Sequence, residues 1–129
     1  MDVNDLAEAI AFELLSYSEK LDGELENIVD RVADEVNQEI KSHITFNQRT
    51  GKYVKSFRIK KLYSDQKFNH SRIWFVAAPH YRLTHLLENG HALRNGGRAR
   101  AFPHIIFGEK LAQERMTELC EKAVTDAAD

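Results

Sequence analysis

Residues 6–41 decide the fold, and they read LAEAIAFELLSYSEKLDGELENIVDRVADEVNQEIK. Apolar side chains recur in this stretch at steps of three, four or seven residues, and acidic residues occupy many of the positions between them. The apolar positions are Leu6, Ile10, Leu14, Leu21, Leu25, Ile28, Val32, Val36 and Ile40. This period predicts an amphipathic helix with one apolar and one charged face.

The predicted helix is long for the chain that contains it. It spans about 57 Å if it starts after Asn4, the expected N-cap, and continues unbroken to about Lys41. The chain has 129 residues, which predicts a single domain (residues 1–129) with one hydrophobic core. So small a domain cannot cover the whole helix. We therefore expect either a bend at Gly23 or an apolar stripe that packs partly on a neighbouring copy.

The rest of the chain predicts shorter elements, each bounded by glycine or proline. In order, they are an extended segment at Lys52–Tyr63, a strand at Arg72–Ala77 stopped by Pro79, a short helix at Tyr81–Glu88 ended by Gly90, a loop over 91–101 and a helix that starts near Pro103. The expected fold class is α+β: a long N-terminal helix, a small antiparallel sheet, a short helix, a mobile Gly/Arg loop and a C-terminal helix packed on the sheet.

Composition excludes several classes of protein. With 43% hydrophobic and 29% charged residues, the chain lies in the range of folded globular proteins. Its longest apolar runs are far shorter than the roughly 20 residues that cross a bilayer, so we expect no contact with membranes. The acidic N-terminus lacks the features of a secretory signal, which predicts synthesis in the cytoplasm. Cys120 is the only cysteine, so an internal disulfide and zinc sites with several thiolates are excluded.

Charge is segregated along the chain. Residues 1–40 carry twelve acidic and two basic side chains, whereas residues 41–110 carry fourteen basic and three acidic ones. This pattern favours head-to-tail docking of copies, or contact between the basic region and an anion such as DNA. An equally weighted alternative is that the fold brings the two regions together and their charges cancel within one subunit.

Four short motifs follow one another in a characteristic order. They are Thr50-Gly51 after the long helix, Pro79-His80-Tyr81 after the strand, Glu88-Asn89-Gly90, and Phe102-Pro103 at the start of the last helix. Their succession resembles the tail-component family of tailed bacteriophages and prophages, over most of the chain. The residues that carry the resemblance are Thr50, Gly51, Pro79, Tyr81, Glu88, Gly90, Phe102 and Pro103. The chain departs from the family pattern at Asn89, where an aromatic residue is frequent, and in an Arg-rich insert after His91.

The resemblance implies a structural protein of the virion without enzymatic activity or a cofactor. Members of the family join head and tail or complete the tail, and this implies a ring, a hexamer, at the head-proximal end of the tail. The implied partners are copies of the chain itself, tail-tube proteins and head-connector proteins. DNA that passes through the channel of such a ring would meet the basic region without sequence-specific contact.

Catalytic and metal-binding patterns are weak in the sequence. His80, His85 and His91 are separated by five and six residues, whereas two ligands on one helix face need a spacing of three or four. We therefore interpret these residues and His104 as surface or partly packed histidines, and predict no metal site and no catalytic residue. A divalent-ion nuclease would need several carboxylates, but Glu88 is the only one between residues 66 and 108.

The candidates for contact with a partner or with DNA are Arg94, Arg98 and Arg100, which lie in a glycine-containing segment. The alternative function is a small DNA-binding protein that uses the basic middle region. No helix-turn-helix pattern or zinc-finger spacing supports sequence-specific recognition of DNA.

Overall fold

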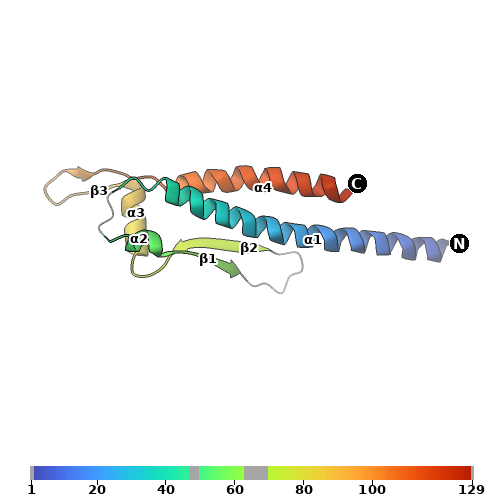
Figure 1. The fold of residues 1–129 in the computed structure, drawn as a ribbon. Helices are drawn as coiled ribbons and strands as arrows, with labels where there is room; N and C mark the ends of the chain where they lie inside the picture. Colours follow the sequence, from blue (N-terminus) through green and yellow to red (C-terminus); the bar gives the residue numbers. More distant parts are fainter. Residues whose placement is uncertain (1, 47–49, 63–69, 129) are drawn as a thin grey trace.

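The computed structural model describes residues 2–46, 50–62 and 70–128. In chain order the elements are α1 (Val3–Ser42), α2 (Lys52–Lys55), β1 (Phe57–Leu62), β2 (Ser71–Val76), α3 (Tyr81–Asn89), β3 (His91–Ala92), β4 (Arg98–Ala99) and α4 (Ile105–Ala128). The α+β fold expected from the sequence is confirmed (Figure 1).

Helix α1 contains 40 residues, about 60 Å at 1.5 Å per residue, and continues through Gly23 without interruption. The prediction that Asn4 is the N-cap is wrong, because Asp2 has this role. The Asp2 carboxylate accepts a hydrogen bond from the N–H of Asp5 (2.9 Å), and the Asp5 carboxylate accepts one from the N–H of Asp2 (3.3 Å). This reciprocal capping box starts the helix before Asn4. Among the described residues, no helix combines the length and apolarity needed to cross a bilayer.

Helix α4 lies antiparallel to α1 and covers its C-terminal half (Figure 1). The rings of His43 and Phe107 stack with their centroids 3.7 Å apart. A Cβ atom on Gly108 would lie 2.6 Å from a side-chain carbon of Ile40, so the two helices approach closely there. With 24 residues, α4 is about 36 Å long and ends well before α1 begins. The first part of α1 therefore extends beyond the end of α4.

Strands β1 and β2 form an antiparallel hairpin that packs on α1 through β2, with a register from Phe57 opposite Val76 to Leu62 opposite Ser71. The small core at this end contains Ile40, Tyr53, Phe57 and Val76. The extended segment predicted at Lys52–Tyr63 is wrong in its first part, because residues 52–55 form the one-turn helix α2, which carries Tyr53 into the core. Tyr63 lies outside the described residues.

Residues 91–99, predicted as a loop, contain a short second hairpin formed by β3 and β4. Its tight turn is closed by a hydrogen bond from the N–H of Leu93 to the carbonyl of Gly97 (2.7 Å). At its base, Gly90 has φ +74°, and a Cβ there would lie 2.6 Å from the carbonyl oxygen of Ala99. Only glycine satisfies both conditions without strain. The hairpin lies at the end of the molecule opposite to the N-terminus of α1 (Figure 1).

Candidate functional site

A partly buried carboxylate connects α3 to α4. The Glu88 side chain accepts hydrogen bonds from the backbone N–H groups of His104 (2.8 Å), Ile105 (3.0 Å) and Ile106 (3.1 Å) at the start of α4. Burial raises the pKa of Glu88, but these three donors and the nearby His104 ring outweigh it, so the pKa lies below its ordinary value. A carboxylate in this position satisfies helix N–H groups that otherwise lack partners and complements the helix dipole.

His104 is completely buried beside this carboxylate. Its Nδ1 lies 2.8 Å from the carbonyl oxygen of Phe102, which can only accept, so Nδ1 carries a proton. Its Nε2 lies 2.8 Å from the hydroxyl of Tyr53, whose pKa is raised mainly by burial. The prediction of a surface or partly packed histidine is wrong for His104, because both ring nitrogens find partners within the chain. With no exposed atoms, the ring has a structural role.

The motif residues found in the sequence meet around this network. Gly51, at φ +72°, is the N-cap of α2, which delivers Tyr53. The backbone N–H of Phe102 donates to the carbonyl of Leu87 (2.6 Å), and its ring meets Phe46 edge-on at 5.6 Å. The remaining motif residues lie nearby in the chain: Thr50 before Gly51, Gly90 after α3, and Pro103 before His104.

The motif after β2 has a different position. Pro79 follows a cis peptide bond between β2 and α3, and Tyr81 is the first residue of α3. Tyr81 is 50% exposed, so its ring is available to a partner. The motifs thus define the junction of α2, α3 and α4, and they leave one aromatic side chain at the surface.

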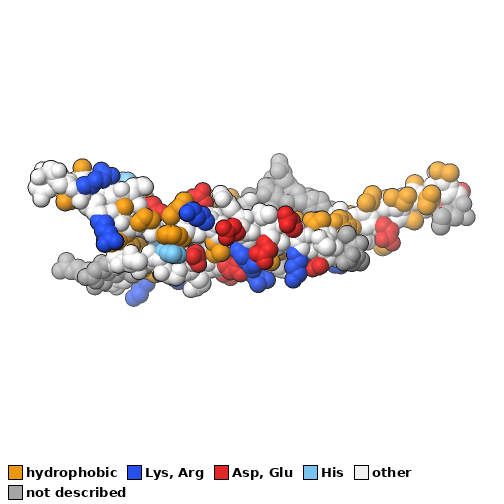
Figure 2. Space-filling model, turned by 90° about the horizontal axis from the view of Figure 1, so that it is seen from above, with side chains coloured by type: hydrophobic (Ala, Val, Ile, Leu, Met, Phe, Trp, Pro, Cys, Tyr) orange, Lys and Arg blue, Asp and Glu red, His pale blue; other side chains and the backbone are white. Residues whose placement is uncertain are grey.

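The three predicted contact arginines are brought together by the β3–β4 hairpin. Arg94 lies in its turn, Arg98 starts β4, and Arg100 follows β4 with its guanidinium 5.5 Å from the centre of the Phe102 ring. Arg82 of α3 lies at the same end of the molecule, and the sequence analysis did not single it out. All four are exposed, and none forms an ion pair with a carboxylate of the described residues. We call Arg82, Arg94, Arg98 and Arg100 the basic pole (Figure 2).

The middle of α1, in contrast, is neutralised within the subunit. Its ion pairs with residues of the β1–β2 hairpin and α4 include Glu26–Lys61 (2.7 Å), Asp30–Arg72 (2.7 Å) and Glu35–Arg115 (2.9 Å). The Asp22 carboxylate lies within hydrogen-bond distance of Nε2 of His70 (2.5 Å). The charge cancellation considered in the sequence analysis therefore occurs in this part of the molecule. It does not include the basic pole or the first turns of α1.

Residues 3–16 of α1, which we call the arm, are exposed throughout. Their large apolar side chains are Val3, Leu6, Ile10, Phe12, Leu14 and Leu15. Leu6, Ile10 and Leu14 recur at helical spacing and form one apolar face. Figure 2 shows this end of the molecule as a row of hydrophobic side chains that project beyond the rest of the chain.

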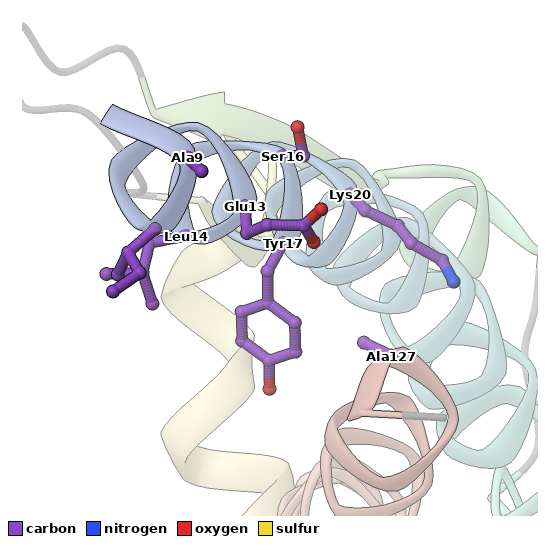
Figure 3. Close-up of a pocket in the computed structure, with 8 residues that line it drawn as sticks. Ala9, Glu13, Leu14, Ser16, Tyr17, Lys20 and Ala127 are labelled. Atoms are coloured by element: carbon purple, nitrogen blue, oxygen red, sulfur yellow. The ribbon is translucent and has the colours of Figure 1, made fainter. Parts of the chain in front are cut away.

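An open groove lies where α4 ends beside α1. It is lined by Ala9, Ile10, Glu13, Leu14, Ser16, Tyr17 and Lys20 of α1 and by Ala127 of α4. Figure 3 shows Tyr17 and Lys20 on the same side of α1 as Ala127. The groove therefore continues the path of α4 along the apolar face of the arm.

No group of three His, Cys, Asp or Glu side chains in residues 2–46, 50–62 and 70–128 could hold a metal ion. Comparison of the chain with protein-family models, with curated proteins and with solved structures found no significant match. The candidate functional surfaces are the arm, which exposes apolar side chains, and the basic pole, which exposes four arginines.

Proposed function

We propose that this chain is a structural subunit of a bacteriophage tail or neck, which joins head and tail or completes the tail by assembling into a ring. The phage context comes from the ordered motifs between Thr50 and Pro103. The proposed subunit is made in the bacterial cytoplasm, becomes part of the virion, and binds copies of itself together with tail-tube and head-connector proteins.

The observation that carries this proposal is the uncovered arm. A soluble monomer rarely exposes a continuous apolar surface of this kind, because full burial of one Leu or Ile side chain is worth about 1.5–3 kcal/mol. Phe12 is 68% exposed and Leu14 is 62% exposed, although both lie on a regular helix. Such a helix gains most of its stability when a second protein surface covers it.

The network around Glu88 and His104 supports the same proposal. Its hydrogen bonds connect α3, which carries Arg82, to the start of α4 directly after Arg100, so a partner meets an already folded junction. Preformed surfaces lose less conformational entropy on association than disordered ones. A subunit that assembles repeatedly in one geometry benefits from this property.

The experiment is disruption of the gene in the phage or prophage that encodes the chain, followed by electron microscopy of the lysate. We expect filled heads and separate tails instead of joined particles. The wild-type gene supplied in trans should restore joined particles, and a gene with Leu6→Ser and Leu14→Ser in the arm should not. Normal particles in the disrupted strain would refute the proposal.

A second candidate is a small DNA-binding protein, favoured by the four unpaired arginines of the basic pole. The β1–β2 hairpin gives this candidate less support, because Lys61 and Arg72 both pair with carboxylates of α1. DNA binding would fall steeply with salt, and removal of Arg94, Arg98 and Arg100 would flatten that dependence. Unchanged DNA affinity of this variant with loss of particle joining would favour assembly.

A further inference from the structure

The two ends of the molecule carry opposite charge. Asp2 caps the arm, which carries Asp5, Glu8 and Glu13, and the first basic residue of the chain is Lys20. The basic pole carries four arginines. Glu88 is the carboxylate nearest to it in sequence, and it already accepts hydrogen bonds from three backbone N–H groups at the start of α4. The end formed by the arm is therefore acidic, and the end formed by the pole is basic (Figure 2).

Both ends also expose apolar side chains. At the pole, Tyr81, Leu83 and Leu93 are 50%, 45% and 42% exposed, and they alternate in the chain with Arg82 and Arg94 along α3 and the β3–β4 hairpin. The arm presents the face formed by Leu6, Ile10 and Leu14. An apolar centre with a charged rim is the usual anatomy of a specific protein interface.

We infer that the arm of one copy docks on the basic pole of the next copy, head to tail. This contact deepens the proposed function and rests on it for the ring. In a head-to-tail contact each subunit uses two different surfaces, so subunits continue to add until the rotation between them closes a ring. The groove at the end of α4 gives the incoming pole a surface that includes Ile10, Leu14 and Tyr17.

Charge excludes the symmetric alternatives. Two arms side by side would bring together eight carboxylates with no basic residue among them, counting those of both N-caps. Two poles would likewise bring together eight guanidinium groups. Like charges at an interface oppose association, whereas opposite charges accelerate encounter and fix the orientation. A nucleic acid on the pole would neutralise the arginines but would leave the apolar face of the arm uncovered.

The test is a charge swap in the full-length chain. One variant carries Glu8→Lys and Glu13→Lys in the arm, and the other carries Arg94→Glu and Arg98→Glu in the pole. Each variant alone has one end whose four like charges have been reduced to a net charge of zero, so the attraction between its two ends is lost. We expect its self-association to weaken by at least about tenfold in sedimentation velocity at low salt. In an equimolar mixture the unchanged acidic arm of the pole variant meets the unchanged basic pole of the arm variant, and the substituted side chains of the two other ends have opposite signs. We expect association to return.

Matched controls make the same charge changes elsewhere on exposed positions. Glu114→Lys with Glu121→Lys in α4 controls for the arm variant, and Lys60→Glu with Lys122→Glu controls for the pole variant. These four side chains are exposed and form no ion pair within the described residues. We expect both controls to associate like the wild type. Far-UV circular dichroism checks that every variant is folded.

Three outcomes would overturn the contact. The first is a wild-type chain that stays monomeric at concentrations up to about 1 mM. Its dissociation constant would then be higher than that of a specific contact. The second is an equimolar mixture that fails to regain association. The third is a pole variant that loses only DNA binding, measured with a short duplex, and still self-associates.

Gene disruption separates this inference from the proposed function. If the swap fails but heads and tails remain separate without the gene product, the joining role holds and the arm-to-pole contact falls. If the swap succeeds but particles form normally without the gene product, the contact holds and the joining role falls.

Discussion

The two halves of α1 belong to one continuous helix, yet they have opposite surroundings. From Leu21 to Ile40 the helix is partly or fully covered on its apolar face by α4 and β2, and its acids pair with Lys61, Arg72 and Arg115. From Val3 to Ser16 the same kind of apolar and acidic pattern meets only solvent. The difference teaches that sequence period alone builds the helix, whereas the length of α4 decides which half is covered.

The largest effect should come from the covered half. Ile40 is 1% exposed and lies against Gly108 of α4, so Ile40→Ala removes buried methyl groups and leaves a cavity. We expect the free energy of unfolding in urea to fall by about 2–5 kcal/mol. Ile10→Ala makes the same chemical change in the arm and should change it by no more than about 0.5 kcal/mol at concentrations where the chain is monomeric. Equal losses would show that the two halves do not differ.

The junction of α3 and α4 should give the next effect. Glu88→Gln removes the negative charge that three backbone N–H groups of α4 surround, and we expect a loss of about 1–3 kcal/mol in stability at neutral pH. Glu8→Gln in the arm is the control, since Glu8 is exposed and takes no part in the α1 cap or in an ion pair of the described residues.

The stability effect of Glu88→Gln should depend on pH in a definite direction. Because the pKa of Glu88 is lowered in the folded chain from its ordinary value of 4.5, its contribution is fully present above that value. It is lost as pH falls through the lowered folded pKa. The stability difference between wild type and Glu88→Gln should therefore shrink below about pH 4.5. A difference that stays constant into the acid range would contradict the role of the charge.

The ion pairs in the middle of α1 should contribute less to stability than the Glu88 carboxylate does. Arg72 pairs with Asp30 (2.7 Å), and its side chain is only 8% exposed, although that of Asp30 is largely in solvent. We expect Arg72→Gln to cost about 1 kcal/mol or less, and to cost still less in 1 M salt, because ions screen the pair. Arg82→Gln in the basic pole is the control, and urea unfolding of both variants should show no loss for it. A loss for Arg72→Gln that does not respond to salt would point to packing of its stem instead.

Sequence reasoning predicted the elements that depend on local pattern. The amphipathic period predicted α1, and Pro79 and Gly90 marked the limits of α3. It missed the N-cap at Asp2, because Asn4 and Asp2 are both good caps and only Asp5 at the third helical position selects Asp2. It also missed the hairpin at 91–99, whose strands are two residues long and depend on contacts rather than on alternation.

The candidate site was predicted less completely than the fold. The arginines of the β3–β4 hairpin were identified from their place among glycines, but Arg82 was not, because only the folded chain brings α3 to the same end. His104 was misjudged, since its two partners, Tyr53 and the carbonyl of Phe102, depend on the junction of three helices. The sequence indicated that α1 is too long for so small a domain to cover. It did not indicate which end of the helix stays uncovered.

The smallest effect on stability, with the largest on assembly, should come from the arm. Leu6→Ser with Leu14→Ser changes two apolar side chains that are 50% and 62% exposed in the free subunit, so the free energy of unfolding should change by about 0.5 kcal/mol or less. Self-association should nevertheless be lost. The wild-type melting temperature should rise with protein concentration, because assembly stabilises the folded state, and that of the variant should not. A large loss of stability in dilute solution would mean that the arm packs within its own subunit, and the contrast between the two halves of α1 would disappear.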